Sequence, residues 1–230
     1  IKPFYLRRKK KNVLQDLPSK IYTQHHIELS LKTKKLYHLA DKDFPAYLKH
    51  LGKDDDSIQK TLSNPDAKQI YLRQITSLSS DKIKATVDYT KSILNIGEKV
   101  VIFAYYRETI NILSKEIEGS VGLVGSDDKK YVKNILTDFQ EKEDIKVLIL
   151  SISAFNAGIN LFQASKVILH DIDWVPGVND QAIDRLHRIG QKSTVQAVFM
   201  SCNDTLDEIM YYSCLKKQRV INKVIEGDCS

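Results

Sequence analysis

Two arginines in the second half of the chain, Arg185 and Arg188, have a spacing that suits binding of a phosphoryl group. They lie three residues apart in the run Gln-Ala-Ile-Asp-Arg-Leu-His-Arg-Ile-Gly-Gln, residues 181–191. On a helix this spacing places both side chains on one face, within reach of one target. Guanidinium groups stay charged near pH 7 and grip phosphate oxygens bidentately. The alternative is a surface helix with solvated arginines. Gln181, the stop at Gly190 and the strand-like flanking segments favour phosphate binding.

Small polar and aromatic residues follow three apolar runs elsewhere in the chain. Ser153 follows the run 147–150, and small hydroxyl residues at such a turn can present backbone N–H groups to a phosphate. A plain strand-to-helix connection is the alternative there. Ser126 follows the run 121–124, where it suits either a helix N-cap or a backbone phosphate contact. Tyr105 and Tyr106 follow the run 100–104, as ligand contacts or as packing residues.

The elements that must position these residues are short, β-branched strands alternating with helices. Five runs have this character: 100–104, 121–124, 147–150, 167–169 and 195–200. Fully apolar strands with helical segments between them predict a parallel sheet covered by helices on both faces. In such sheets ligands gather beyond the carboxyl ends of the strands. The residues that follow the runs are therefore the ones to examine.

The region before the first of these runs, residues 28–96, has helical periodicity instead. Polar breaks are expected at 52–57, where Ser57 is a candidate N-cap, and at 64–66, which contains a proline. A helix should open at Ser80 or Asp81 and run to about Asn95, with Gly97 just beyond its end. A last helix is expected from Leu206 to about residue 225.

Composition places the chain among ordinary globular proteins with a basic balance. A net charge of +6 and a pI near 9.0 are compatible with a polyanionic partner. No apolar stretch approaches the roughly 20 residues that span a bilayer, so no membrane partner is expected. The three cysteines are widely spaced and suit neither a disulfide framework nor a metal knuckle, which favours a reducing intracellular compartment. The first residues, 1–4, have neither an initiator Met nor a signal-peptide pattern and look like a cut from a longer protein.

The arginine run and the segments that follow the strands resemble one known family. The order of residues 181–191 is similar to the last motif of the Snf2-type group of superfamily 2 helicase-like ATPases, which are double-stranded DNA translocases. The alternation from Glu98 onward is similar to a RecA-like lobe, and the segment 6–20 resembles the brace between two such lobes. The resemblance implies an α/β fold with a RecA-like parallel sheet and an N-terminal helical protrusion. It divides the chain into a brace or linker (1–27), a helical protrusion with a lead-in helix (28–96) and the C-terminal lobe (97–230).

The resemblance also implies roles for particular residues. Arg188 would be the arginine finger and Arg185 a partner of the γ-phosphate, with Gln181, Gly158 and Asn160 binding or sensing nucleotide. Ser153, Tyr105 and Ser126 would contact DNA, and no residue would bind metal. The segment 151–161 resembles the family's fifth motif. It departs from that motif at Asn156 and Ala157, which replace the usual glycine pair.

In the family that the chain resembles, the phosphate loop belongs to a separate first lobe. No Gly-x-x-x-x-Gly-Lys-[Ser/Thr] segment occurs in the sequence. ATP with Mg²⁺ would therefore sit between this lobe and an N-terminal RecA-like lobe that supplies the phosphate loop and the Mg²⁺ ligands. The isolated chain is then expected to be inactive as an ATPase, and the whole protein would be nuclear if eukaryotic. The rival interpretation is a non-catalytic DNA- or protein-binding module with a degenerate helicase lobe. A Rossmann-like transferase is disfavoured, because the turn after Phe103 is not glycine-rich.

Overall fold

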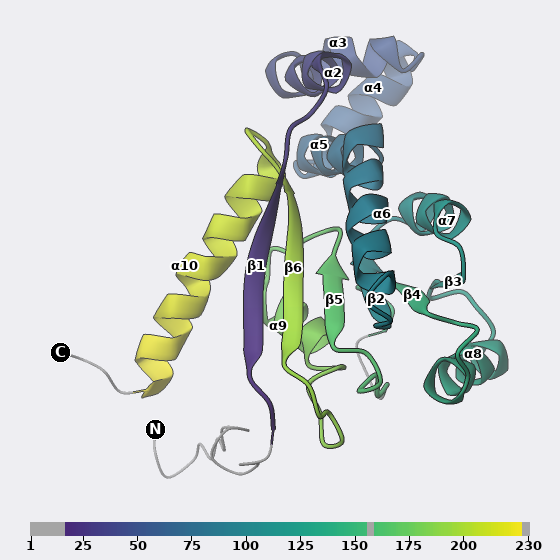
Figure 1. The fold of residues 1–230 in the computed structure, drawn as a ribbon. Helices are drawn as coiled ribbons and strands as arrows, with labels where there is room; N and C mark the ends of the chain where they lie inside the picture. The colour runs from purple at the N-terminus through teal and green to yellow at the C-terminus, as the bar shows by residue number, and fades with distance from the viewer. Residues whose placement is uncertain (1–16, 156–158, 227–230) are drawn as a thin grey trace.

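The computed structural model describes residues 17–155 and 159–226, and its centre is a six-stranded parallel sheet (Figure 1). The strand order is β1-β6-β5-β2-β4-β3, and every pair is parallel. The strands are β1 (Lys20–Ile27), β2 (Val100–Ala104), β3 (Ser120–Leu123), β4 (Val147–Ser151), β5 (Lys166–Leu169) and β6 (Val195–Cys202). The helices are α2 (Leu31–Lys42), α3 (Phe44–His50), α4 (Asp55–Leu62), α5 (Ala67–Ser77), α6 (Ser80–Leu94), α7 (Arg107–Glu116), α8 (Lys129–Glu141), α9 (Pro176–Ile183) and α10 (Leu206–Glu226).

Helices cover both faces of the sheet, as the apolar runs predicted. Successive side chains of a strand point to opposite faces, so Val101 and Phe103 of β2 join one core while Val100 and Ile102 join the other. The first core packs against α8, α9 and α10, and the second against α6 and α7. The central strands β2 and β4 are buried along their whole length. The RecA-like fold class predicted from the sequence is thereby confirmed.

Strand β1 was not expected from the sequence. Its eight residues read Lys-Ile-Tyr-Thr-Gln-His-His-Ile, and only Ile27 among them is buried. The strand nevertheless pairs with β6 along its whole length, from Lys20 opposite Val195 to Ile27 opposite Cys202. The segment is a strand because its backbone pairs with β6, and it contains no apolar run. A prediction based on hydrophobic periodicity therefore does not detect it. Part of the segment assigned to the linker is thus an edge strand of the sheet.

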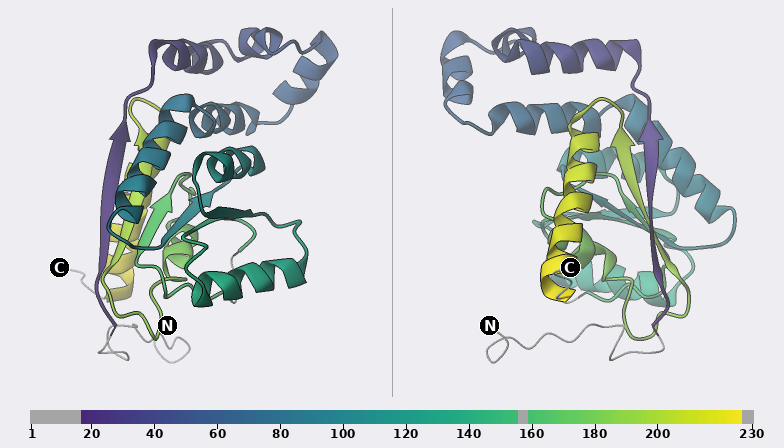
Figure 2. Two further views of the ribbon diagram at one scale, coloured as in Figure 1. Left: turned by 45° about the vertical axis from the view of Figure 1, so that its right-hand side comes forward. Right: turned by 90° about the vertical axis from the view of Figure 1, so that its left-hand side faces the viewer.

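Helices α2 to α5 form a protrusion beyond the carboxyl end of β1 (Figure 2). It has a core of its own, made of Tyr37, Ala40, Phe44, Tyr47, Leu48, Ile58, Ala67, Leu72 and Ile75. The expected break before α4 is present, but its cap differs from the prediction. Asp54 accepts a hydrogen bond from the backbone N–H of Ser57 at 2.7 Å, so Asp54 is the N-cap and Ser57 lies inside the helix. A carboxylate three residues before a free N–H serves as a cap at least as well as a serine.

The lead-in helix α6 begins and ends as predicted. Ser79 caps it by accepting from the N–H of Lys82 at 3.2 Å, and its last helical residue is Leu94. Gly97 beyond its end has a φ of 80°, in the left-handed region that glycine tolerates. Among the described residues, no helix is long and apolar enough to cross a membrane.

A buried charged network fastens this helix to the sheet. Lys82 is fully buried, and its Nζ donates to Asp207 Oδ2 at 2.6 Å and lies 3.8 Å from Asp171 Oδ1. Asp207, at the start of α10, also accepts from Thr76 Oγ1 of α5 at 3.1 Å. Burial disfavours the charged ammonium, but the neighbouring carboxylates outweigh it and raise the pKa of Lys82. The network therefore joins α5, α6 and α10 to the end of β5.

We expect Lys82→Met to destabilise the chain by about 3–5 kcal/mol, because it leaves Asp207 and Asp171 buried without their cation. Lys84→Met is the matched control: Lys84 lies two residues further along α6 and is exposed, so its effect should stay within about 0.5 kcal/mol. Urea unfolding of residues 1–230, followed by circular dichroism, measures both. A loss below about 1 kcal/mol for Lys82→Met would show that the network does not hold the fold together.

Candidate functional site

The candidate residues that follow the strands all lie at the carboxyl end of the sheet, the edge formed by the last residues of the parallel strands. Tyr105 follows β2, Ser126 follows β3 and Ser153 follows β4, and all three strands run in the same direction (Figure 1). Asp171 follows β5 at the same edge. This is the edge at which ligands of open parallel sheets gather.

Tyr105 and Tyr106 have different environments. The Tyr105 ring is 41% exposed, and the Arg73 guanidinium lies over it, 4.8 Å from its centroid. The backbone N–H of Tyr105 donates to Asp171 Oδ2 at 2.7 Å, which fixes the chain at the end of β2. Tyr106 is half-buried, and its hydroxyl donates to the Ile70 carbonyl at 3.1 Å. Tyr106 therefore packs against α5, while Tyr105 has Arg73 over its ring and remains partly exposed at the end of β2.

The turns after β3 and β4 touch each other. A Cβ at Gly125 would lie 2.9 Å from the Cβ of Ala154, so only glycine allows this approach. Ser126, next to Gly125, accepts a hydrogen bond from Arg107. Ser153, next to Ala154, is exposed, and its hydroxyl lies 3.1 Å from that of Ser151.

Ser126 is not the N-cap of α8. Asp128 has that role, and its Oδ1 accepts from the N–H groups of Lys130 and Tyr131 at 2.9 and 3.0 Å. The carboxylate is better placed because it stands one residue before the first helical position. The hydroxyl of Ser126 is thereby left at the sheet edge, beside the turn that carries Ser153.

The two arginines lie in a turn rather than on a helix, contrary to the prediction. Helix α9 ends at Ile183, and residues 184–190 continue as a series of turns. Arg185 is only 6% exposed and Arg188 is half-buried. Burial lowers the pKa of Arg185, and the nearby charge of Arg188 lowers it further. The carboxylate of Asp184 acts in the opposite direction and raises that pKa.

Tertiary hydrogen bonds hold the turn that follows α9. The carbonyl of Arg185 accepts from the N–H of Leu161 at 2.9 Å, and that of Leu186 accepts from Gln191 Nε2 at 3.2 Å. The same Gln191 amide donates to the carbonyl of Ala164 at 2.9 Å. The buried Gln191 side chain therefore joins the turn to the segment before β5.

Asn160 links the segment after β4 to the arginine turn. Its Oδ1 accepts from Arg188 Nη1 at 2.6 Å, and its carbonyl accepts from Gln140 Nε2 of α8 at 2.9 Å. Gln181 is exposed on α9, four residues before Arg185. Gly158, Asn156 and Ala157, and the proposed brace up to residue 16, lie outside the described residues. The structure therefore joins two of the predicted nucleotide-site residues, Asn160 and Arg188.

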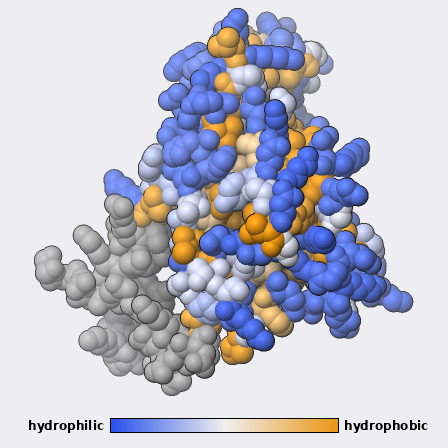
Figure 3. Space-filling model, viewed as in Figure 1, coloured by the Kyte–Doolittle hydropathy of each residue, from blue (hydrophilic) through white to orange (hydrophobic). Residues whose placement is uncertain are grey.

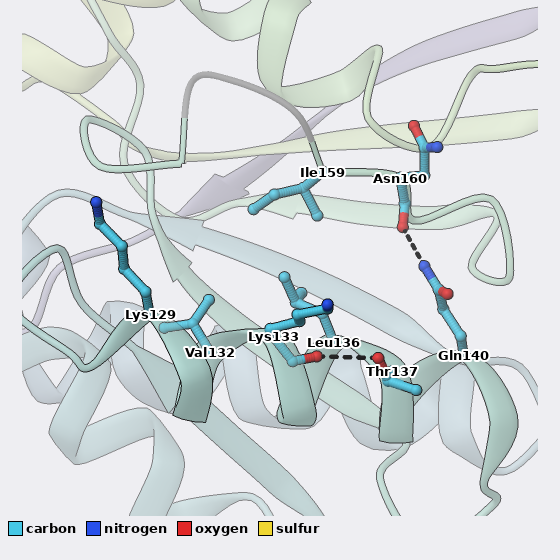
Figure 4. A pocket seen from close by; sticks show the side chains of 8 residues that line it. All are labelled: Lys129, Val132, Lys133, Leu136, Thr137, Gln140, Ile159 and Asn160. Carbon is cyan, nitrogen blue, oxygen red and sulfur yellow. Dashed lines mark hydrogen bonds between the residues drawn. The ribbon is translucent and has the colours of Figure 1, made fainter.

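A hollow of about 300 Å³ opens beside Asn160 (Figure 4). It lies between α8 and the segment 159–160, and its walls are Lys129, Val132, Lys133, Leu136, Thr137, Gln140, Ile159 and Asn160. Lys129 and Lys133 stand one helical turn apart on its α8 side. The lining therefore combines these two lysines and three uncharged polar side chains with three aliphatic ones. Within residues 17–155 and 159–226, no three His, Cys, Asp or Glu side chains are grouped as metal ligands.

Sequence reasoning missed Arg73 and Lys82 as site-supporting residues. Both lie in the helical region before the first apolar strand, far along the chain from Tyr105 and Asp171, which they support. Arg73 also donates from Nη2 to the carbonyl of Ile172 at 3.0 Å. No local sequence pattern predicts the contacts of Arg73. For Lys82 the one available signal was its position on the apolar face of α6.

Comparison with known proteins adds to this geometry. Residues 81–190 match the model of the helicase conserved C-terminal domain. An uncharacterized ATP-dependent helicase of Mycoplasma genitalium is 32% identical over 98% of this chain and 23% of its own length. The mouse DNA annealing helicase and endonuclease ZRANB3 is 29% identical over 96% of this chain and 20% of its own length. The chain thus spans about a quarter or less of these relatives.

A solved structure is similar over nearly the whole chain. The Sulfolobus solfataricus SWI2/SNF2 ATPase core in complex with double-stranded DNA is 27% identical, with a TM-score of 0.68. The match covers 99% of this chain and 51% of that one.

Gly190→Ala should destabilise the chain by about 1–2 kcal/mol, because Gly190 has a φ of 103° and an added Cβ would lie 3.3 Å from the Phe162 ring. Gly177, in the first turn of α9, has open space and no positive φ, so Gly177→Ala should be neutral or slightly stabilising. Thermal unfolding of the two variants provides the comparison. Equal midpoints would show that the turn does not depend on its glycine.

Proposed function

Because the chain belongs to the Snf2-type family of helicase-like ATPases as a C-terminal RecA-like lobe, we propose that it is one half of an ATP-dependent double-stranded DNA translocase. In this role it supplies the arginine finger and one of two DNA grips. The observation that carries the proposal is the arginine turn, where Arg185 is buried and Arg188 donates a hydrogen bond to Asn160 in the segment after β4. The phosphate loop and Mg²⁺ ligands belong to the preceding lobe.

The arginine turn suits a phosphoryl group on electrostatic grounds. Two like charges at one turn repel each other, and burial of Arg185 adds a desolvation cost. Asp184 offsets part of this cost, and a bound phosphoryl group would offset more of it, which supports assigning the turn to nucleotide. Arg188 is oriented by the amide oxygen of Asn160, which carries no net charge to neutralise the guanidinium. We assign Arg188 as the finger, Arg185 as the γ-phosphate partner, and Gln181, Gly158 and Asn160 to nucleotide sensing.

Bound nucleotide would supply the transferring phosphoryl group, and its Mg²⁺ would neutralise part of the phosphate charge. This lobe's contribution is charge stabilisation alone. Arg188 would meet negative charge that develops on the equatorial oxygens, and Arg185 would hold the γ-phosphate in line. Neither residue exchanges a proton, since arginine stays protonated at neutral pH. The segment after β4 carries both Asn160 and Ser153, which gives a direct route from the nucleotide to the DNA side.

The DNA grip is assigned to the edge that carries Tyr105, Ser126 and Ser153. Hydroxyl groups and backbone N–H groups at strand ends suit phosphate oxygens, which carry no sequence information. The face seen in Figure 3 is largely hydrophilic over the protrusion and over α8, and the chain has a net charge of +6. We therefore propose contact with the sugar-phosphate backbone of a duplex, without reading of its bases.

In the two-lobe parent protein, Arg188→Ala should lower the rate of ATP hydrolysis by roughly 10³–10⁵ while leaving DNA affinity nearly unchanged. The reason is that a finger meets charge present mainly in the transition state. Arg188→Lys should not restore the rate, because an ammonium does not reproduce the bidentate fork. Steady-state phosphate release under saturating duplex DNA is the measurement.

Lys192→Ala is the control for loss of a nearby exposed cation and should keep parental turnover. If Arg188→Ala hydrolyses ATP within a few-fold of the parent, the turn is structural, and the non-catalytic binding module becomes the better account.

Residues 1–230 alone should bind duplex DNA weakly and without sequence preference. The logarithm of affinity should fall with the logarithm of salt concentration by about 0.9 per phosphate neutralised. Tyr105→Ala should weaken binding, whereas Tyr212→Ala should not, because Tyr212 is similarly exposed, at 52%, but lies on α10. Fluorescence anisotropy at several salt concentrations distinguishes these outcomes. Salt-independent binding, or equal effects of the two substitutions, would contradict the backbone grip.

A further inference from the structure

The first residues of β1 are tied to α9 by two side-chain contacts. Lys20 Nζ donates to Asp184 Oδ1 at 3.1 Å, and the Tyr22 hydroxyl donates to Asp180 Oδ1 at 3.2 Å. Lys20 and Tyr22 are two apart on a strand, and Asp180 and Asp184 are four apart at the end of a helix. Each pair therefore shares one face of its element, and the two faces match.

A third contact reaches into the arginine turn itself. His187 Nε2 lies 2.6 Å from the carbonyl oxygen of Pro18. A carbonyl only accepts, so Nε2 carries the hydrogen, which fixes the tautomer of this ring. His187 is 8% exposed and stands between Arg185 and Arg188 in the sequence. The chain that enters the sheet is thus bound to the residue next to the proposed finger.

The Lys20 contact is partly sheltered from water. The side chains of Lys20 and Asp184 are 24% and 32% exposed, and Lys20 Nζ also lies 5.7 Å from the centre of the Tyr22 ring. Burial by itself would lower the pKa of Lys20, but Tyr22 and Asp184 outweigh it and raise that pKa. Sheltered pairs are screened less by salt than fully exposed ones.

The arginine turn needs such contacts because α9 ends before it. On one side, the carbonyls of Arg185 and Leu186 are held by Leu161 and Gln191. On the other side, the turn and the end of α9 are held by the segment that leads into β1. Without those contacts, the turn would be fixed from one side only.

We propose that these contacts form a clasp that positions the arginine finger, made of the Pro18 carbonyl and the side chains of Lys20, Tyr22, Asp180, Asp184 and His187. The clasp also makes the placement of Arg188 depend on the segment before β1, which the resemblance identifies as the brace from the preceding lobe. The proposal rests on the proposed function, because it requires Arg188 to act in turnover. Its members are positioning residues, since they act through the turn and not on nucleotide.

The test is a charge exchange in the two-lobe parent protein. Lys20→Glu and Asp184→Lys should each lower kcat for DNA-stimulated ATP hydrolysis roughly 3- to 10-fold, as expected for breaking a coupled pair. KM for ATP and Kd for duplex DNA should stay within about twofold. The double variant should recover most of kcat, because it restores opposite charges at the same two positions.

The matched control is the pair of Lys34 and Glu28, whose Nζ and Oε2 are 3.0 Å apart near the other end of β1. Exchanging these charges should leave kcat unchanged. Urea midpoints of all variants separate positioning from stability. The proposal is overturned if the Lys20 and Asp184 single variants keep parental kcat, if the double variant recovers none of it, or if kcat falls only in proportion to the unfolded fraction.

Arg188→Ala measured alongside separates this proposal from the function on which it rests. An inactive Arg188→Ala together with unaffected clasp variants would reject the clasp and retain the finger. An active Arg188→Ala would reject both.

Discussion

Parallel pairing of β2 with β4 on one side and β5 on the other is the constraint on which the candidate site depends. Because the three strands run in one direction, the segments after them emerge at the same edge. An antiparallel neighbour would have sent one of those segments to the far end of the sheet. The hydrogen bond from the N–H of Tyr105 to Asp171 joins two of the strand ends directly. The proposed DNA-contacting residues therefore lie together because the strands that precede them are parallel.

A fully buried ammonium group, that of Lys82, lies near the same edge. Lys82 is fully enclosed, and a buried ammonium is tolerated only with partners such as Asp207 and Asp171. Through Ser77, which donates to Asp171 Oδ2 at 3.0 Å, the network also reaches the last residue of α5. The protrusion is thereby connected to the end of β2, where the Tyr105 ring lies under Arg73. Contacts of Arg73 and Ser77 therefore connect α5 of the protrusion with Tyr105 in the proposed DNA-contacting edge.

The arginine turn places two cations in one short segment of the chain. Arg185 is buried, and both its burial and the charge of Arg188 disfavour its charged form, while the carboxylate of Asp184 favours it. In the proposed role, these guanidiniums would stabilise the charge that is redistributed during phosphoryl transfer. The clasp and the buried Gln191 would then have one task in common, which is to hold the arginine turn in position.

The sequence by itself determined the central strands, the order of helices and the residues that gather at the sheet edge, because those depend on apolar runs and on the polar residues directly after them. It did not determine β1, whose polar residues become a strand only by pairing with β6. It also placed Arg185 and Arg188 on a helix, since nothing local ends α9 before Gly190. In the structure α9 ends at Ile183 and passes into turns closed by short-range backbone hydrogen bonds, from the N–H of Arg185 to Ala182 and from that of Leu186 to Ile183. Leu161 and Gln191 then bind the carbonyls of Arg185 and Leu186, and no local pattern encodes these long-range contacts.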